Sequence, residues 1–364
     1  MPPRISIRDV AARAGVSPTT VSHVLNRTPG TRTSEVTQDR VRRAAAELGY
    51  TANPAARTLR TRRSDSVGFV GDEIATTPYA GELIAGAQEV VRTRDGVLLV
   101  TNSGYDADLE AREIRELLDR EVDGVLYAAM YHRLVRVPDA LADVPVVVLN
   151  AEAVGGSYSW VTPDEVAGGQ DAADLLLRAG HRRLAMLTNA HDIPAAHGRP
   201  AGFLAACRQA GVAGADVTVV TSEPDVEASW RAARALLAGP DRPTALFCFS
   251  DLMAMGAYRA ARELGLRIGQ DVSVVGFDDL RILTEAVDPP LASVALPHRA
   301  MGAWAAEQLY QQISARDEGH EPAPRTARLR GRSCTGRPWA RRPGNDPGAT
   351  PGGAALQRGT STTR

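Results

Sequence analysis

Cysteine is scarce in this sequence, with three residues in 364, which excludes a small secreted scaffold held together by disulfides. No apolar run approaches the roughly 20 residues of a membrane helix, and the N-terminus lacks an apolar signal segment. Enzyme signatures are also missing: there is no GxSxG, phosphate-binding loop, GxGxxG opening a helix, or metal-type His and Cys cluster. We therefore expect a protein of the reducing cytoplasm, outside the membrane, that is not an enzyme and holds no metal or cofactor.

What the sequence does contain is a strongly uneven distribution of charge behind a formal net charge of −1. Residues 1–63 carry 12 Arg against 4 acidic residues, residues 64–315 carry 20 against 35, and residues 316–364 carry 10 against 4. A basic block ahead of an acidic body favours an appended module that binds a polyanion, although a solvated basic face has the same composition. The length and the apolar content of 44% predict several packed domains.

The first 50 residues carry the signals of three short helices. Ser6 and Asp9 have the spacing of a capping box, Gly15 ends that first helix, and Ser17 with Pro18 starts the next one. The residues expected to face inward from the second and third helices are Val21, Val24, Leu25, Val41, Ala45 and Leu48. Three short helices with a tight glycine turn between the first two predict a helix-turn-helix module.

The outer side of the second helix has side chains suited to reading DNA. Thr19 and His23 lie one turn apart near the part of the helix that reaches base edges in this motif, where His23 could donate to guanine and Thr19 could contact a thymine methyl. Four polar residues are better suited to phosphate oxygens, namely Ser17, Thr20, Ser22 and Asn26. The alternative is a helical module that binds another protein.

From residue 64 on, short apolar runs alternate with amphipathic helical stretches. Strands are expected at 67–71, 97–100, 122–127 and 144–149, and again at 184–187, 217–220, 245–249 and 272–277. This alternation makes right-handed crossovers and a mostly parallel sheet, and its repetition predicts two α/β lobes with a ligand between them at the carboxyl ends of the strands.

Several motifs resemble one known family. IRDVA at 7–11, AGVS at 14–17 and TVSHVLN at 20–26 closely resemble the opening of LacI/GalR-family transcriptional regulators. The resemblance continues in family order through LGY at 48–50, NPAAR at 53–57, VDGV at 122–125, AGHRR at 179–183, AGF at 201–203, DLMAMG at 251–256 and DVSVVGFDD at 271–279. It covers roughly residues 4–313 and makes DNA binding the expected function.

The resemblance implies an all-α helix-turn-helix headpiece followed by an α/β, two-lobed, periplasmic-binding-protein-like (type I) effector domain in which each lobe is a mostly parallel sheet. The expected divisions are 1–52 for the headpiece, 53–63 for a hinge helix, 64–315 for the effector and dimerisation domain, and 316–364 for a disordered tail rich in Arg, Pro and Gly. Leu59 matches the residue that wedges into a base step in relatives. The implied DNA contacts are Ser17, Pro18, Thr19, Thr20, Ser22, His23, Asn26, Tyr50, Asn53, Ala56, Arg57 and Leu59.

By the same resemblance, Arg199 matches an arginine that grips ligand hydroxyls or carboxylates, and Asp278 matches an acid that accepts hydrogen bonds from them. Ser250 stands where the family usually has Asn, which removes one amide contact. The full set implied to bind the effector is Tyr79, Asn150, Arg199, Pro224, Ser250, Asp278 and His298. A sugar is the leading ligand and a nucleobase the second.

The predicted function is a sequence-specific repressor, homodimeric on a pseudo-palindromic double-stranded operator, whose affinity for DNA changes when a small effector binds between the lobes. A nucleobase-responsive co-repressor system and a non-regulatory sugar-binding protein are the alternatives. The tail departs from the family pattern: Arg and Gly occupy positions 328–333, where an apolar strand is usual, and a changed reading frame after about residue 315 is one explanation.

Overall fold

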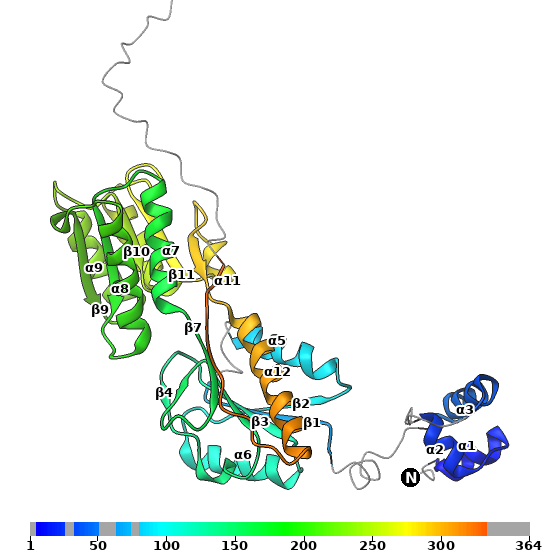
Figure 1. The fold of residues 1–364 in the computed structure, drawn as a ribbon. Helices are drawn as coiled ribbons and strands as arrows, with labels where there is room; N and C mark the ends of the chain where they lie inside the picture. Colours follow the sequence, from blue (N-terminus) through cyan, green and yellow to red (C-terminus); the bar gives the residue numbers. More distant parts are fainter. Residues whose placement is uncertain (1–4, 26–32, 51–62, 74–79, 333–364) are drawn as a thin grey trace, which may run out of the picture.

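The computed structural model describes residues 5–25, 33–50, 63–73 and 80–332 (Figure 1). The N-terminal part consists of α1 (Ile7–Ala14), α2 (Pro18–Leu25) and α3 (Glu35–Leu48). Gly15 ends α1 in the left-handed conformation at φ 64°, and the Ser17 hydroxyl accepts the amide of Thr20 at 3.1 Å at the start of α2. Val10, Val21 and Val41 are fully buried at the centre of this small core. The module therefore has a core of its own.

The N-terminal lobe is built on a six-stranded parallel sheet in the order β13-β7-β5-β3-β1-β2. Its strands are β1 (Ser66–Gly71), β2 (Val97–Asn102), β3 (Gly124–Ala128), β5 (Val146–Leu149), β7 (Ser159–Pro163) and β13 (Thr326–Leu329). Helices α5 (Ala80–Arg92) and α12 (His298–Asp317) cover one face, and α6 (Ala107–Asp119) covers the other. All four residues of β5 are buried, as expected for a strand with helices on both sides. A small sheet pairs β4 (Leu134–Val135) with β6 (Glu152–Ala153).

The C-terminal lobe repeats this plan with a five-stranded parallel sheet in the order β12-β11-β10-β8-β9. Its strands are β8 (Leu184–Asn189), β9 (Val217–Ser222), β10 (Ala245–Cys248), β11 (Ser273–Asp278) and β12 (Ala292–Ala295). Helices α7 (Glu165–Arg178) and α8 (Pro194–Gln209) pack on one face, α9 (Val226–Leu237) and α10 (Asp251–Glu263) on the other, and the short α11 (Arg281–Thr284) follows β11.

The chain passes between the lobes at three places (Figure 1). It leaves the N-terminal lobe between β7 and α7 and returns between β12 and α12. A third segment follows β13, where a Cβ on Gly331 would lie 1.8 Å from the carbonyl oxygen of Ala295. Because the backbones approach so closely, only glycine fits there. Glu165 and His298, the first residues of α7 and α12, therefore lie at the hinge.

The expected strands are present with small shifts, but the prediction of a disordered tail from residue 316 is wrong for residues 316–332. Helix α12 extends to Asp317, and β13 pairs in parallel with β7. Ala327 and Leu329 pack against the core of the N-terminal lobe, and Arg328 and Arg330 make ion pairs with Glu152 and Asp171. Ordered pairing through Leu329 also argues against a changed reading frame near residue 315. Residues 333–364 lie outside the described part of the chain.

No helix among the described residues has the length and apolar character needed to cross a membrane. Within the same ranges, no group of His, Cys, Asp and Glu side chains is arranged to hold a metal ion. The two cysteines described, Cys207 and Cys248, are buried and unpaired, and burial raises the pKa of both thiols.

Candidate functional site: a DNA-reading head and an interlobe cleft

The outer face of α2 carries the side chains predicted to meet DNA. Ser17, Pro18 and Thr19 are exposed, whereas Val21 and Val24 on the opposite side are buried. The remaining described members of the predicted set, half-exposed on α2 or after α3, are Thr20, Ser22, His23 and Tyr50. The helix thus presents Thr19 and His23 outward, with Ser17 holding its first turn. The predicted contacts Asn26, Asn53, Ala56, Arg57 and Leu59 lie outside the described residues.

The second candidate site is a cavity of about 370 Å³ between the two lobes. Its polar side chains follow the ends of the parallel strands: Asn150 comes after β5, Asn189 ends β8, and Asp278 ends β11. The carboxyl edge of each sheet faces the other lobe, which is where open α/β sheets hold ligands. Six of the seven predicted effector residues line this one cavity, namely Asn150, Arg199, Pro224, Ser250, Asp278 and His298. The seventh, Tyr79, lies outside the described residues.

Arg199 on α8 is almost fully buried at the base of the cavity. Its Nε donates to Glu165 Oε2 at 2.8 Å, and its Nη1 donates to the carbonyl of Phe249 at 2.5 Å. The guanidinium also lies over two rings, 4.2 Å from the centroid of Phe249 and 3.7 Å from that of Phe277. These contacts fix the position of the arginine before any ligand arrives, because both its charge and its planar faces already have partners.

Burial shifts the pKa of Asp278 and that of His298, whereas neighbouring side chains decide the pKa of Glu165. It raises the pKa of the Asp278 carboxyl well above its ordinary value, although Arg199, with Nη1 at 3.8 Å, acts in the opposite direction. Burial lowers the pKa of His298 to about 4, so this imidazole is neutral near pH 7. For Glu165, burial acts to raise the pKa, but Arg199 and His132 outweigh it and the pKa is lowered. The cleft therefore holds one matched ion pair.

Asn150 and Ser250 are held by backbone contacts. Asn150 has a left-handed φ of 59°, and its Nδ2 donates to the carbonyls of Ala129 and Met130 at 3.0 and 3.1 Å. The Ser250 hydroxyl accepts the amide of Met253 at 3.2 Å and so caps α10. Ser250 thus caps α10 at the cavity wall. A short hydroxyl side chain fits this position because it can accept the backbone amide.

Two family models match this chain in the order of its domains. The model described as bacterial regulatory proteins, lacI family, matches residues 6–53, and the model described as periplasmic binding proteins and sugar binding domain of LacI family matches residues 64–330. The chain belongs to the LacI family. Membership confirms the predicted resemblance and fold class, and it confirms a DNA-binding regulator rather than an enzyme, because the model of residues 6–53 describes regulatory proteins.

Similar proteins cover nearly the whole LacI-family chain. The ribose operon repressor of Haemophilus influenzae is 31% identical over 316 residues, which are 86% of this chain and 94% of that protein. The repressor PurR of Pectobacterium atrosepticum is 33% identical over 319 residues, 86% of this chain and 92% of its own. A solved complex of the transcriptional regulator CelR with cellobiose has 29% identity and a TM-score of 0.61, covering 93% of this chain and 100% of that one.

Sequence reasoning missed several cleft residues of this LacI-family chain, among them Glu165 and His132. Both are buried and line the same cavity as Arg199. Glu165 follows Asp164, which caps α7, and two acidic residues at the start of a helix are the ordinary pattern of capping. His132 lies in the loop after β3, where no local pattern marks it. Only the folded arrangement brings these side chains to Arg199.

Proposed function

We propose that this LacI-family protein is a repressor that binds a pseudo-palindromic operator as a homodimer and releases it when a sugar enters the interlobe cleft. The observation that carries the proposal is the gathering of six predicted effector residues around one cavity at the hinge, beside a separate helix-turn-helix head. Among these residues, Asn150 belongs to the N-terminal lobe, and Arg199 and Asp278 belong to the C-terminal lobe. A ligand that contacts all three favours one angle between the lobes.

On DNA, we assign base contact to Thr19 and His23 and phosphate contact to Ser17, Thr20 and Ser22. Exposure on the outer face of α2 supports this assignment. The hinge segment with Leu59 would enter the minor groove, where an apolar side chain partly unstacks a base step. Each head reads one half-site, so two copies are needed for the symmetric operator.

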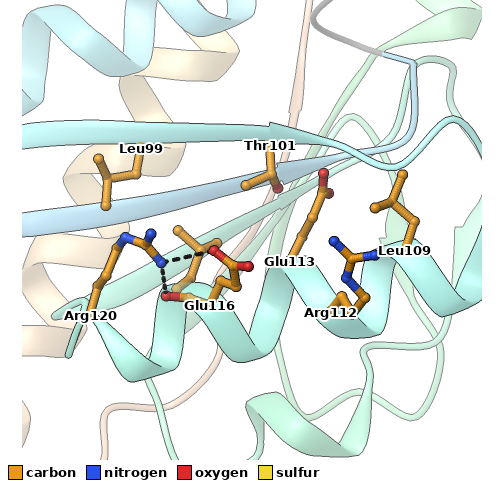
Figure 2. Close-up of a pocket in the computed structure, with 8 residues that line it drawn as sticks. Leu99, Thr101, Leu109, Arg112, Glu113, Glu116 and Arg120 are labelled. Carbon is orange, nitrogen blue, oxygen red and sulfur yellow. Dashed lines mark hydrogen bonds and ion pairs between the residues drawn. The ribbon is translucent and has the colours of Figure 1, made fainter.

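The dimer face that we propose in the N-terminal lobe centres on β2, the edge strand of its sheet. Val97 and Val100 are 55% and 40% exposed and lie on opposite faces of this edge strand, so that apolar surface flanks the free edge on both sides. Figure 2 shows the adjoining pocket, in which Leu99 and Thr101 of β2 face the side chains of α6. One oxygen of Glu113 is buried there without a partner among the described residues. A second copy of the chain would cover this face.

A sugar is the effector that the cleft favours, with a nucleobase as the second candidate. The aromatic side chain of Phe249, the carboxyl of Asp278 and the amide of Asn150 together suit a molecule with a flat apolar face and several hydroxyls. The similar CelR protein is solved with cellobiose, and a ribose operon repressor is among the relatives. PurR relatives keep the nucleobase candidate in the test.

A thermal-shift screen tests the effector site directly. We expect ribose, cellobiose or a related sugar to raise the melting temperature in proportion to the logarithm of its concentration over the dissociation constant, and purine bases to do so only if the second candidate holds. Arg199→Ala should abolish that shift and lower the free energy of unfolding by about 3–5 kcal/mol, because Glu165 is left buried without its partner. Arg231→Ala, at a 70% exposed arginine of α9, is the matched control.

Operator binding by the same proteins separates the two functions. We expect a duplex selected from a random pool to bind wild type, Arg199→Ala and Arg231→Ala equally well without ligand, because the head has its own core. A full ligand-induced shift in Arg199→Ala would contradict the assignment of the cleft. Failure of the wild type to select any duplex would contradict the proposed repressor.

A further inference from the structure

Three residues that line the cleft each have one buried polar atom without a hydrogen-bond partner within the described structure: Asn150 Oδ1, His132 Nδ1 and Glu165 Oε1. These residues are only 2%, 6% and 5% exposed. A buried polar atom without a partner is costly, and native proteins accept it mainly where a ligand or water completes the bond. The three atoms come from both lobes, and each belongs to a residue that lines the cavity.

The chemistry of these atoms is mainly that of acceptors. Asn150 must direct its Nδ2 at the carbonyls of Ala129 and Met130, which leaves Oδ1 as the open atom. Glu165 uses Oε2 for Arg199 at 2.8 Å, so Oε1 is the oxygen left for another donor. His132 Nδ1 is 3.4 Å from that same Oε1, longer than a good hydrogen bond. Two acceptors beside an imidazole match the donor hydroxyls of a polyol.

The charge of Arg199 is already matched by Glu165 inside the protein. The two side chains are 6% and 5% exposed, so water does little to screen the pair. Burial lowers the pKa of His298 to about 4, which removes a second source of positive charge from the cavity. His191, at the rim, is 59% exposed and lies 3.1 Å from Glu223. An acidic ligand would meet Glu165, and no unmatched cation lies among the described residues that line the cavity.

We propose that Glu165 and His132 form a specificity subsite of the effector cleft, which accepts the hydroxyls of neutral ligands and rejects ligands that carry a carboxylate or phosphate. Glu165 does this in two ways: Oε2 occupies the Arg199 edge that would otherwise grip an anion, and Oε1 repels an anion while accepting a hydroxyl. His132 lies between the two carboxylates, with Nε2 3.3 Å from Glu152 Oε1 and Nδ1 3.4 Å from Glu165 Oε1. This inference rests on the proposed effector function of the cleft.

The test compares neutral sugars with their oxidised forms. The probes are ribose, glucose, galactose and cellobiose. Each is compared with the acid made by oxidising a terminal CH2OH group of the same sugar to a carboxylate, which leaves the ring closed. Dissociation constants are measured on the full chain by calorimetry, with thermal shift as a second readout. We expect at least one neutral sugar to bind, and its acid to bind at least tenfold more weakly.

The variant Glu165→Gln keeps the shape of the side chain and removes its charge. We expect the ratio of acid to neutral affinity to rise at least tenfold, because Arg199 becomes an unmatched cation. The control is Glu223→Gln, which removes a 60% exposed carboxylate that pairs with His191 and is not one of the residues lining the cavity; its ratio should equal that of wild type. If Glu165→Gln does not fold, the wild-type ratios still decide the question.

Three results would overturn the inference: an acid that binds wild type within threefold of its neutral partner, an unchanged ratio in Glu165→Gln, or no binding by any member of the panel. As a parallel measurement, the binding of the selected duplex DNA is assayed with the same wild-type preparation. Loss of DNA binding would speak against the proposed repressor, whereas a failed selectivity ratio with intact DNA binding speaks only against the subsite.

Discussion

At the scale of single residues, Arg199 explains why the cleft is ordered before it is filled. Its hydrogen bonds to Glu165 and Phe249 and its position over the ring of Phe277 each restrict the guanidinium. Lysine could supply the charge but neither the fork of donors nor the flat face, so Arg199→Lys is not a conservative change. A preformed arginine loses little conformational entropy when the ligand binds.

Asp251 gives this protein a stability that depends on pH. Burial raises its pKa from 3.8 to about 7, even though its oxygens accept from the Ser293 hydroxyl and the Leu280 amide, both at 2.6 Å. The folded chain therefore keeps a proton that the unfolded chain has lost. The free energy of unfolding should fall as pH rises from about 4 to about 7, by up to about 1.4 kcal/mol per pH unit from this group.

Denaturant titrations of Asp251→Asn at several pH values check this expectation. The amide keeps the size of the side chain and cannot ionise, so the slope between pH 4 and pH 7 should flatten. Asp241→Asn, at a 99% exposed side chain of the same lobe, should retain the wild-type slope. Equal slopes in Asp251→Asn and wild type would contradict the account.

At the scale of elements, the close packing of α7 on α8 brings Glu165 to Arg199. Gly202 on α8 faces the α7 backbone, and a Cβ there would lie 1.9 Å from the carbonyl oxygen of Val166. A Cβ on Gly169 of α7 would lie 2.1 Å from the carbonyl oxygen of Arg199. Glycines thus allow the two helices to approach until the buried ion pair can form.

Gly202→Ala should separate α7 from α8 and lower the free energy of unfolding by about 1–3 kcal/mol, as overpacking of a tight interface does. Ligand affinity should fall with it, because Glu165 and Arg199 move apart. Chemical denaturation and the thermal-shift assay measure the two effects. The control is Gly239→Ala, where a Cβ would contact nothing within 4 Å. A Gly202→Ala protein as stable as the control would refute the packing argument.

The elements differ in how much their sequence reveals. The helices of the head could be predicted because Gly15 and Ser17 act within a few residues of themselves. The buried strands β5 and β10 could be predicted because their apolar runs are continuous. Strand β13 could not, since Arg328 and Arg330 find acidic partners at Glu152 and Asp171, far away in the chain.

The candidate site divides in the same way. Motifs shared with the family placed Arg199 and Asp278, and the structure brings both to one cavity. Glu165 and His132 could not be predicted, because the approach of Glu165 to Arg199 depends on helix packing and the approach of His132 to Glu165 depends on the angle between the lobes. Side chains whose partners are distant in the chain leave no periodic signal in the sequence.

At the scale of the whole molecule, the β2 face predicts how two copies associate. Val100→Asp should raise the dissociation constant of the dimer about tenfold or more, because a buried charge at the interface would lack a partner. Analytical ultracentrifugation over a concentration series measures it. Val219→Asp, at a 37% exposed valine on the edge strand of the other lobe, is the control and should leave the constant unchanged. An unaltered dimer in Val100→Asp would place the interface elsewhere.

We expect the crossovers between the two lobes to couple the effector cleft to the DNA-reading head. Glu165 begins α7 at one crossover and His298 begins α12 at another, so two cleft residues lie where the lobes rotate. A ligand that draws them toward one arrangement changes the lobe angle, and the N-terminal lobe continues directly into the segment that leads to the head. Coupling between two such sites is typically 1–3 kcal/mol, or about 5–150-fold in affinity.

The most direct test is the affinity of the full chain for its selected operator, measured by gel shift at one fixed salt concentration with and without a saturating cleft ligand. We predict that the ligand weakens operator binding by about tenfold or more in wild type and has no effect in Arg199→Ala. An operator affinity that stays the same, or tightens, when the cleft of the wild-type protein is saturated would contradict induction through the hinge.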